Sequence, residues 1–527
     1  MKMGLTDRQK QAALDHARSK CVTAGAGTGK TYVLVQKYID LLESRDDLSV
    51  ANILALTFTE KAAAEMKVRV REALAKKEGA RWDSLRDEFL WANISTFHSF
   101  CAQVLREFPL EAGVAPGFAV LDEREAARLR DEVVDAFVYG EPPETCRDAL
   151  VGVLRMAGVH ELRNTLERLS SRREAAEQFF AALAGSEETV LDAWRTAVER
   201  CREEELAIFA AAAGASIGTL QDLAARYPGA ADPAQVYLRA VEQHLPSFAA
   251  GECGAVRALA EIHADSRFRA NMGRKPNWKG DDLGRLRDAY KTLDNCLKAH
   301  GEFLSLAIDP DDPFTRATLD YLRDLGVVFA AYSDAVDTAK RRRNALDFDD
   351  LIDRTHRLFR EHEAIVEAHF RRRFRFVLVD EFQDTDPVQN GIICSILGDL
   401  ARTSAKLFVV GDPKQSIYLF RDADVTQFKR TRDLIEQDLG GEAVPLDVNF
   451  RSTPAIVGFV NAIFGALMAE SARPWEFRYE PLEACRKGDA GSVELLLVPK
   501  AEDRQSGRRA EAEMVARKIQ NLIEHEK

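Results

Sequence analysis

Residues 24–31 read Ala24-Gly25-Ala26-Gly27-Thr28-Gly29-Lys30-Thr31. They follow a short apolar run at 21–23 and precede an amphipathic stretch at 32–42. A strand, a glycine-rich turn and a helix in this order are the setting of a phosphate-binding loop. Glycines let successive backbone N–H groups point at a polyphosphate, and the helix N-terminus adds its dipole. The strict pattern begins with glycine, and Ala24 fits that place if its φ is negative.

Two side chains at the end of this loop carry the expected chemistry. Lys30 is placed to reach the β- and γ-phosphates of a nucleotide, and the Thr31 hydroxyl is placed to hold Mg²⁺. A glycine-rich turn without a ligand is the alternative. The Lys-Thr pair after the last glycine favours the nucleotide site, with residues 24–31 as its phosphate cradle.

The second half of this site is predicted far downstream. Residues 374–379 form a nearly continuous apolar run, which is typical of a buried parallel strand. The run ends in Asp380-Glu381-Phe382-Gln383-Asp384. Carboxylates at such a strand end suit a magnesium ligand, Asp380, and a base for the attacking water, Glu381. A solvated acidic turn is the ordinary alternative.

The composition sets broad limits. The chain has 527 residues, 46% hydrophobic and 30% charged, as in a soluble protein of roughly three or four domains. We expect no membrane span and no signal peptide, and therefore a cytosolic protein. The eight cysteines include no Cys-x-x-Cys and are expected to be reduced thiols. The net charge of −12 disfavours a broadly basic nucleic-acid binder and leaves room for a confined, salt-sensitive basic track.

Gln9 has two interpretations. Thr6 or Asp7 can cap a helix, and a carboxamide three residues after Thr6 completes a capping box. The same carboxamide can pair with the donor and acceptor edge of adenine, and one amide can do both. Both interpretations remain open at this point.

Two further strands are predicted at 52–58 and 93–96. Their ends carry Phe58 and Thr96, and His98 follows closely. Strand ends of an open α/β sheet gather at the ligand-binding edge. A hydroxyl and an exposed ring there suit the phosphates and bases of a single strand. For His98, an ordinary structural role is the alternative.

Between residues 110 and 345 helical periodicity dominates, which predicts a large helical insertion within the α/β domain. Residues 267–278 mix cations with two aromatic rings, as in a nucleic-acid contact or a solvated loop. Residues 340–343 are basic and suit either nucleic acid or the end of a helix. The acidic residues at 346–352 are expected to cap the next helix.

The predicted strand at 406–410 leads into residues 411–421. If it lies beside the Asp380 strand, Gln415 comes near the γ-phosphate, and Tyr418 and Phe420 lie where a base can stack. Core packing of both rings is the alternative. A new unit is expected from about residue 444, with a strand at 492–498 and a helix at 510–525. Arg451 would then offer a cation to phosphate across a cleft.

In this order the segments resemble the superfamily 1 DNA helicases of the UvrD/Rep type, most closely the RecB/AddA branch of recombination helicase–nucleases. The resemblance covers residues 4–108 and 346–460. It rests on a Q motif at Gln9 and on helicase motifs at 24–31, 57–63, 380–384, 411–421 and 449–452, together with the signatures at 95–100 and 346–352. Glu60, Phe420 and Asp422 depart from the commonest family residues.

The resemblance implies a fold: a RecA-like P-loop NTPase sheet with a helical insertion and the start of a second RecA-like domain. The expected ranges are 1–109 and 346–440 for the first RecA-like domain, 110–345 for the insertion and 441–527 for an incomplete second domain. ATP and Mg²⁺ are the implied cofactors.

It also implies a role for individual residues. Lys30, Glu381, Gln415 and Arg451 would be catalytic. Thr31 and Asp380 would hold the metal. Nucleotide binding would use Gln9, Ala24, Gly25, Ala26, Gly27, Thr28, Gly29, Lys30, Thr31 and Arg451. The single-strand track would be lined by Phe58, Thr96, His98, Tyr418 and Phe420.

The implied function is ATP-dependent 3′→5′ DNA unwinding or single-strand translocation in recombination or double-strand break repair. Helicase motifs V and VI and a nuclease signature are not found in these residues, so we expect a fragment or the product of a split gene. An ATP-gated single-strand-binding module without turnover is the alternative, and a P-loop kinase is disfavoured by the downstream motifs. Expected partners are DNA and a second helicase–nuclease subunit, in the cytoplasm at the nucleoid.

Overall fold

The computed structural model describes residues 4–249, 252–304, 308–399, 405–417, 424–470, 475–487, 492–498 and 503–525. The chain divides into two compact units, one of residues 1–128 with 340–527 and one of residues 129–339. The second unit lies inside the range predicted as a helical insertion. The P-loop and the acidic motif therefore both belong to the first unit, although 351 positions separate Lys30 from Glu381.

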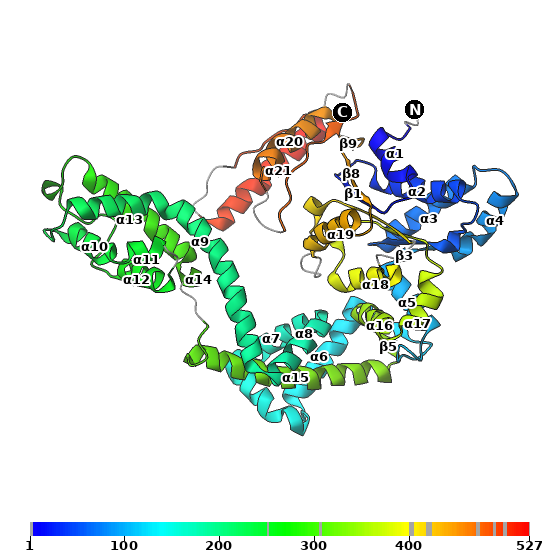
Figure 1. The fold of residues 1–527 in the computed structure, drawn as a ribbon, viewed down its shortest axis with the longest axis horizontal. Helices are drawn as coiled ribbons and strands as arrows, with labels where there is room; N and C mark the ends of the chain where they lie inside the picture. The colour runs from blue at the N-terminus through cyan, green and yellow to red at the C-terminus, as the bar shows by residue number, and fades with distance from the viewer. Residues whose placement is uncertain are drawn as a thin grey trace. The chain divides into compact units, whose positions relative to one another are not determined.

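The first unit is built on a six-stranded parallel sheet in the order β3-β2-β6-β7-β1-β8 (Figure 1). The strands are β1 (Lys20–Ala24), β2 (Ile53–Thr57), β3 (Asn93–Thr96), β6 (Phe376–Val379), β7 (Lys406–Gly411) and β8 (Glu442–Leu446). Because all six run the same way, their carboxyl ends share one edge. The strands predicted at 52–58, 93–96, 374–379 and 406–410 are confirmed, and they bring the P-loop and the acidic motif to that edge.

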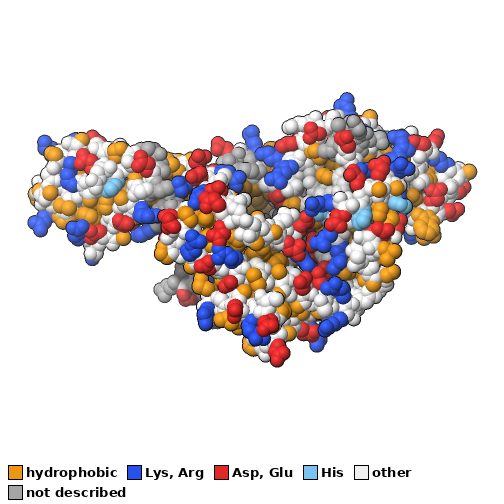
Figure 2. All heavy atoms as spheres, turned by 60° about the horizontal axis from the view of Figure 1, so that its bottom comes forward, with side chains coloured by type: hydrophobic (Ala, Val, Ile, Leu, Met, Phe, Trp, Pro, Cys, Tyr) orange, Lys and Arg blue, Asp and Glu red, His pale blue; other side chains and the backbone are white. Residues whose placement is uncertain are grey.

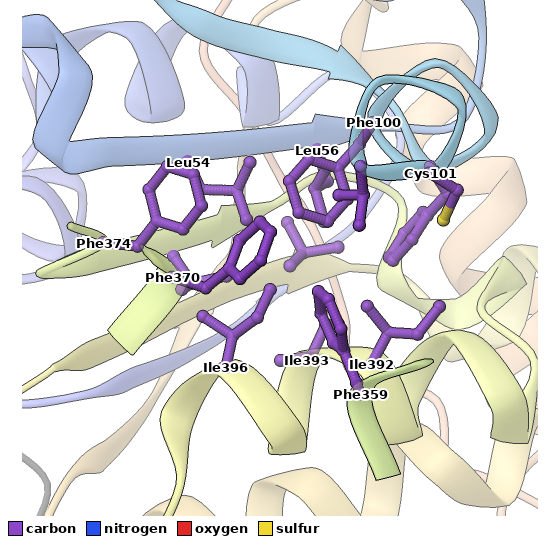
Figure 3. Packing of buried hydrophobic residues seen from close by; sticks show 14 of the residues in the cluster. Leu54, Leu56, Phe100, Cys101, Phe359, Phe370, Phe374, Ile392, Ile393 and Ile396 are labelled. Atoms are coloured by element: carbon purple, nitrogen blue, oxygen red, sulfur yellow. The ribbon is translucent and has the colours of Figure 1, made fainter. Parts of the chain in front are cut away.

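Helices cover both faces of this sheet. One face packs against α1 (Asp7–Leu14), α2 (Lys30–Ser44), α3 (Glu60–Leu74) and α4 (Ala80–Glu88). The other packs against α5 (Phe97–Glu107), α16 (Phe348–Glu361), α18 (Pro387–Leu397) and α19 (Val425–Gln437). Alternate residues of one strand face opposite cores: Leu54 and Leu56 pack beside Phe100, while Ala55 packs on the other side (Figure 3). Burying a leucine of this kind contributes about 1.5–3 kcal/mol.

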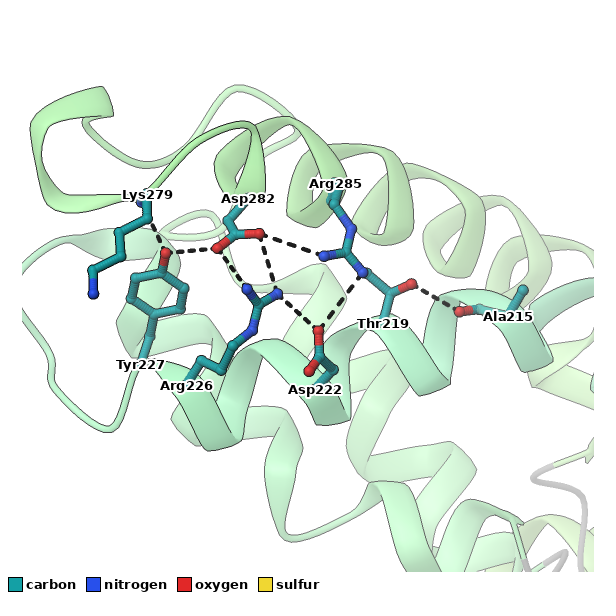
Figure 4. A network of polar contacts seen from close by, with 8 residues as sticks. All are labelled: Ala215, Thr219, Asp222, Arg226, Tyr227, Lys279, Asp282 and Arg285. Atoms are coloured by element: carbon teal, nitrogen blue, oxygen red, sulfur yellow. Dashed lines mark hydrogen bonds and ion pairs between the residues drawn. The ribbon is translucent and has the colours of Figure 1, made fainter.

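The second unit is helical. Its main helices are α7 (Arg147–Ser171), α8 (Arg173–Gly185), α9 (Glu187–Arg226), α10 (Pro233–Glu242), α11 (Leu245–Ala249), α12 (Cys253–Ala264) and α13 (Asp282–Cys296), and α6 (Glu123–Tyr139) and α15 (Pro313–Arg342) connect it to the first. Polar contacts join α9 to α13, as Arg226 pairs with Asp282 at 3.0 Å and Tyr227 Oη donates to it at 2.7 Å (Figure 4). The helices predicted in this range are confirmed.

The aromatic residues at 267–278 have a structural role. Phe268 and Trp278 are buried in the core of the helical unit, and Trp278 Nε1 donates to Asp232 at 2.9 Å. The two rings are therefore not an exposed nucleic-acid contact, while the cations of the segment are exposed, as in the solvated loop: Arg267, Arg269, Arg274 and Lys275. Among the described residues, one helix, α9, is long and apolar enough to cross a membrane by length and composition alone, with a mean hydropathy of 1.4 in its most apolar window. One face of α9, including Phe209 and Leu220, lies in the same core.

Three side chains within residues 340–350 form a buried ion-pair cluster: Lys340, Asp347 and Asp350. Lys340, near the end of α15, is 6% exposed and pairs with Asp347 at 2.6 Å and Asp350 at 2.7 Å. Asp347 and Asp350 also form a capping box for α16, as the sequence predicted. Because Lys340 is buried and paired, it cannot take part in the nucleic-acid contact considered for the basic residues 340–343.

Two expectations for the C-terminal part are wrong. The strand β8 pairs with β1 and belongs to the first sheet, so no new unit begins at residue 441 or 444. Residues 492–498 are described without strand structure, although β-branched and leucine residues there suggested one. The helix predicted at 510–525 is confirmed as α21 (Arg504–His525). Between β8 and residue 492 the chain forms β9 (Val448–Asn449), α20 (Pro454–Leu467) and β10 (Glu483–Ala484).

Candidate active site

The loop after β1 has the backbone of a phosphate cradle. Gly27 and Gly29 have φ of 75° and 85°, a region that side chains rarely adopt. Gly29 starts α2 with no side-chain cap, which leaves the first N–H groups of the helix for an anion. Ala24 is the last residue of β1, where φ is negative, so alanine fits there as predicted.

Two charged side chains meet over this loop. Lys30 Nζ pairs with Glu381 Oε2 at 2.8 Å, across 351 positions of sequence. Glu381 has φ of 49°, a strained conformation for a non-glycine residue that persists when the surroundings hold it firmly. The predicted lysine and the predicted base are therefore in direct contact, and a phosphate would compete with Glu381 for Lys30.

Asp380 lies at the end of β6 and is 6% exposed. The pKa of Asp380 is raised from 3.8 to about 6. Burial is the main cause, the charge of Glu381 adds to it, and Lys30 offsets part of the increase. Its Oδ1 accepts from the Glu381 backbone N–H at 3.0 Å. A buried carboxylate that is costly to ionise fits a divalent cation, because the cation's charge would stabilise the ionised form. Thr31 lies in the first turn of α2, and its role as a metal ligand stays a prediction.

Gln383 and Asp412 join this site without having been predicted from the sequence. Gln383 Nε2 donates to Glu381 Oε2 at 2.9 Å and to Asp384 Oδ2 at 3.0 Å, and its Oε1 accepts from Asp412 N at 2.9 Å. Asp412 Oδ2 in turn accepts from Gln415 Nε2 at 2.7 Å. The position of Gln383 inside the acidic motif was the available signal, but a buried glutamine has no distinctive sequence pattern.

The segment at the end of β7 lies as expected beside β6, because the two strands pair. Gln415 therefore reaches the acidic motif through Asp412. Tyr418 and Phe420 lie outside the described residues, and so does Asp422. Their assignment to a single-strand track stays a prediction.

Gln9 is buried beside the loop. Both bonds of its capping box with Thr6 are present, which confirms the structural interpretation. Its Nε2 also donates to Thr28 O at 3.0 Å, so the carboxamide supports the P-loop backbone. Recognition of adenine by Gln9 stays a prediction.

The predicted single-strand residues of β2 and β3 lie at one edge. Thr57 and Thr96 are paired neighbours, and Phe58 and His98 follow them, both half-buried. Thr96 is buried: it caps α5 and donates to Glu60 Oε1 at 2.7 Å. The His98 ring packs edge-on against Phe348, with centroids 5.0 Å apart. The pKa of Glu60 is lowered mainly by the hydrogen bond that Ser99 donates to it, and secondly by the one from Thr96.

The segment after β8 lies directly on the P-loop. Asn449 Nδ2 donates to Ala26 O at 2.7 Å, and Phe450 N donates to Gly27 O at 2.8 Å. A Cβ at Gly27 would approach Arg451 Cβ to 2.7 Å, so this glycine also permits close contact. Arg451 is exposed beside the loop. Its contact with the γ-phosphate stays a prediction.

A parallel sheet with a P-loop at its carboxyl edge, beside a buried aspartate and a partly exposed glutamate, defines the class of P-loop NTPase folds. Within that class, the family model of the UvrD/REP helicase N-terminal domain matches residues 5–240 and 296–436. The chain belongs to this family.

Relatives named as the A subunit of an ATP-dependent helicase/nuclease give the same assignment. The chain is 29% identical to that of Natranaerobius thermophilus over 90% of its own length and 38% of the relative's. It is 29% identical to that of Geobacillus kaustophilus over 98% of its length and 45% of the relative's. The Enterococcus faecalis protein is 28% identical, over 88% and 38%. The chain thus spans less than half the length of these relatives and matches the RecB/AddA branch.

Proposed function

We propose that this chain provides the ATP-binding part of a DNA helicase or single-strand translocase that moves 3′→5′ in recombination or double-strand break repair. The observation that carries the proposal is the Lys30–Glu381 ion pair of 2.8 Å, with buried Asp380 beside it. These are a phosphate-binding cation, a base and a metal ligand at one sheet edge. Family membership supports a helicase over other P-loop enzymes.

ATP and Mg²⁺ fit the residues present. The uncapped start of α2 and the positive-φ glycines suit the phosphates, and Thr31 and Asp380 would hold the cation. Bound Mg²⁺ would neutralise phosphate charge in the reaction. Lys30 would orient the phosphates, Glu381 would accept the proton of the attacking water, and Gln415 and Arg451 would sense the γ-phosphate.

The proposed DNA is single-stranded or partly duplex, bound at the edge formed by Phe58, Thr96 and His98, with Tyr418 and Phe420 beyond. Figure 2 shows Lys and Arg side chains interspersed with Asp and Glu over the face it draws. A confined track on such a surface should bind DNA with strong salt dependence. The relatives are each named as one subunit of a helicase/nuclease, which supports a partner subunit here. The proposed location is the bacterial cytoplasm, at the nucleoid, where the DNA lies.

The first experiment is ATP hydrolysis by the purified 527-residue chain, with and without single-stranded DNA, beside Glu381→Gln and Lys30→Ala. We expect DNA-stimulated turnover that Glu381→Gln abolishes while ATP still binds, and loss of ATP binding in Lys30→Ala. Unchanged ATP affinity in Lys30→Ala would refute the phosphate site. ATP binding without turnover in the wild type would favour the ATP-gated DNA-binding module instead.

A second experiment tests polarity. Streptavidin displacement from oligonucleotides biotinylated at either end should be faster for 5′-end biotin, because a 3′→5′ motor runs toward that end. Faster displacement from the 3′ end would refute the proposed direction.

A further inference from the structure

One buried glutamine uses every part of its carboxamide at the junction of two strands. Gln383 is 3% exposed, and its Nε2 donates to the carboxylates of Glu381 and Asp384. Its Oε1 accepts the backbone N–H of Asp412. Only a carboxamide can donate at one end and accept at the other in this way. Gln383 therefore ties the base after β6 to the backbone after β7.

The contact with β7 is tight. A Cβ at Gly411 would overlap Gln383 Oε1 and would lie 3.2 Å from the Gln383 backbone nitrogen. The glycine at the end of β7 thus leaves the space that the glutamine fills. A side chain at position 411 would therefore displace the Gln383 carboxamide.

From Asp412 the contacts continue to Gln415, the residue predicted to lie near the γ-phosphate. Asp412 is buried, its Oδ2 accepts from Gln415 Nε2 at 2.7 Å, and its Oδ1 pairs with Lys414 at 2.9 Å. Lys30, Glu381, Gln383, Asp412 and Gln415 thus form one continuous series of polar contacts. It joins the P-loop to the segment in which Tyr418 and Phe420 follow.

At the other end, two donors share one oxygen. Lys30 Nζ and Gln383 Nε2 both contact Glu381 Oε2, at 2.8 and 2.9 Å. When Lys30 turns to phosphate, Gln383 remains as the tether of that oxygen. Whether Lys30 contacts Glu381 or phosphate therefore changes the hydrogen bonding of the carboxylate that Gln383 also contacts.

We propose that Gln383 is a positioning residue that holds Glu381 and couples nucleotide at the P-loop to the affinity of the chain for single-stranded DNA. The inference rests on the proposed function, since it requires that the chain bind both ligands. It concerns the link between the two sites and not the existence of either.

The test measures coupling and does not depend on turnover. Affinity of the full chain for fluorescent oligo(dT) is measured without nucleotide, with Mg-ADP and with Mg-ATPγS. We expect the wild-type affinity to differ at least about fivefold between nucleotide states, the lower end of ordinary coupling. Gln383→Glu, which keeps the acceptor and loses the donor, and Gln383→Met, which loses both without adding charge, should each reduce that ratio below about twofold.

Controls separate positioning from folding. Each Gln383 variant should keep wild-type circular dichroism, and each nucleotide is used at a saturating concentration measured for that variant, so that a change in nucleotide affinity alone does not alter the ratio. Gln235→Glu is the matched control, because Gln235 is also a buried glutamine whose Oε1 accepts a backbone N–H, from Ala231 at 2.8 Å in the helical unit. It should keep the wild-type ratio. Gly411→Ala, which displaces Gln383 without altering it, should lose the ratio as the Gln383 variants do.

The outcomes are distinct. Folded Gln383 variants that keep the wild-type ratio would overturn the inference, as would a wild-type chain that binds both ligands with no coupling. Neither result would touch the P-loop assignment. A wild-type chain that binds no nucleotide, with Lys30→Ala indistinguishable from it, would overturn the proposed function and this inference together.

Discussion

Replacing Asp384 by Asn should make the stability of the protein less dependent on pH. Asp384 is 8% exposed, and its Oδ1 is buried with no hydrogen-bond partner among the described residues. Burial, and secondarily the charge of Glu381, raise its pKa from 3.8 to about 6, while the Gln383 hydrogen bond offsets part of this. At neutral pH the folded protein therefore holds a carboxylate that is harder to ionise than in the unfolded chain.

The sign follows from proton linkage. Between about pH 4 and 6 the folded state binds more protons than the unfolded state, so the free energy of unfolding falls as pH rises through this window. A shift of about two pKa units corresponds to at most ~3 kcal/mol. Solvent near the loop screens the charge, so we expect about 1–2 kcal/mol. The Asp384→Asn variant should gain that amount, relative to wild type, between about pH 4.5 and about pH 7.5.

The assay is urea unfolding followed by circular dichroism from about pH 4.5 to about pH 8, in EDTA and without nucleotide. The free energy of unfolding of the variant relative to wild type is compared between the two ends of the pH range, so that any pH-independent cost of the new amide cancels. Asp87→Asn, an exposed position on α4, is the control and should show no such gain. A pH-independent difference between Asp384→Asn and wild type would refute the assignment of Asp384 as a carboxylate ionised at a cost.

Three other changes have defined outcomes. Lys340→Met removes the ammonium that pairs with two buried carboxylates and should cost about 3–5 kcal/mol in urea unfolding, and a loss below about 1 kcal/mol would contradict the ion-pair cluster. Magnesium should raise the thermal midpoint more at about pH 7.5 than at about pH 5. Burial, with the charge of Glu381, raises the pKa of Asp380 to about 6, so protons compete with the metal below that pH. Asp380→Asn should lose this effect, and an effect that persists in the variant would place the metal elsewhere. Tyr418→Ala with Phe420→Ala should weaken oligo(dT) binding by ~1–3 kcal/mol per lost stack in a fluorescence titration, and unchanged affinity would place both rings in the core.

Several features were predictable because they depend on neighbouring residues. The apolar runs of β1, β2, β6 and β7, the Thr6 capping box and the glycine pattern after Ala24 all act over a few positions. Carboxyl ends of parallel strands share an edge, so even the meeting of Lys30 with the acidic motif followed from the strand prediction. The sequence alone thus determined the fold class and the meeting of the P-loop with the acidic motif; nucleotide binding there stays a prediction.

Only the tertiary structure decided the contacts between distant segments. The pairing of β8 with β1 and the bond from Asn449 to Ala26, 423 positions apart, depend on chain topology and not on local propensity. Trp278 looked like a candidate contact because burial cannot be read from composition. Gln383 was missed for a related reason: a glutamine's partners are set by the strands brought beside it, and its own sequence neighbours carry no sign of them.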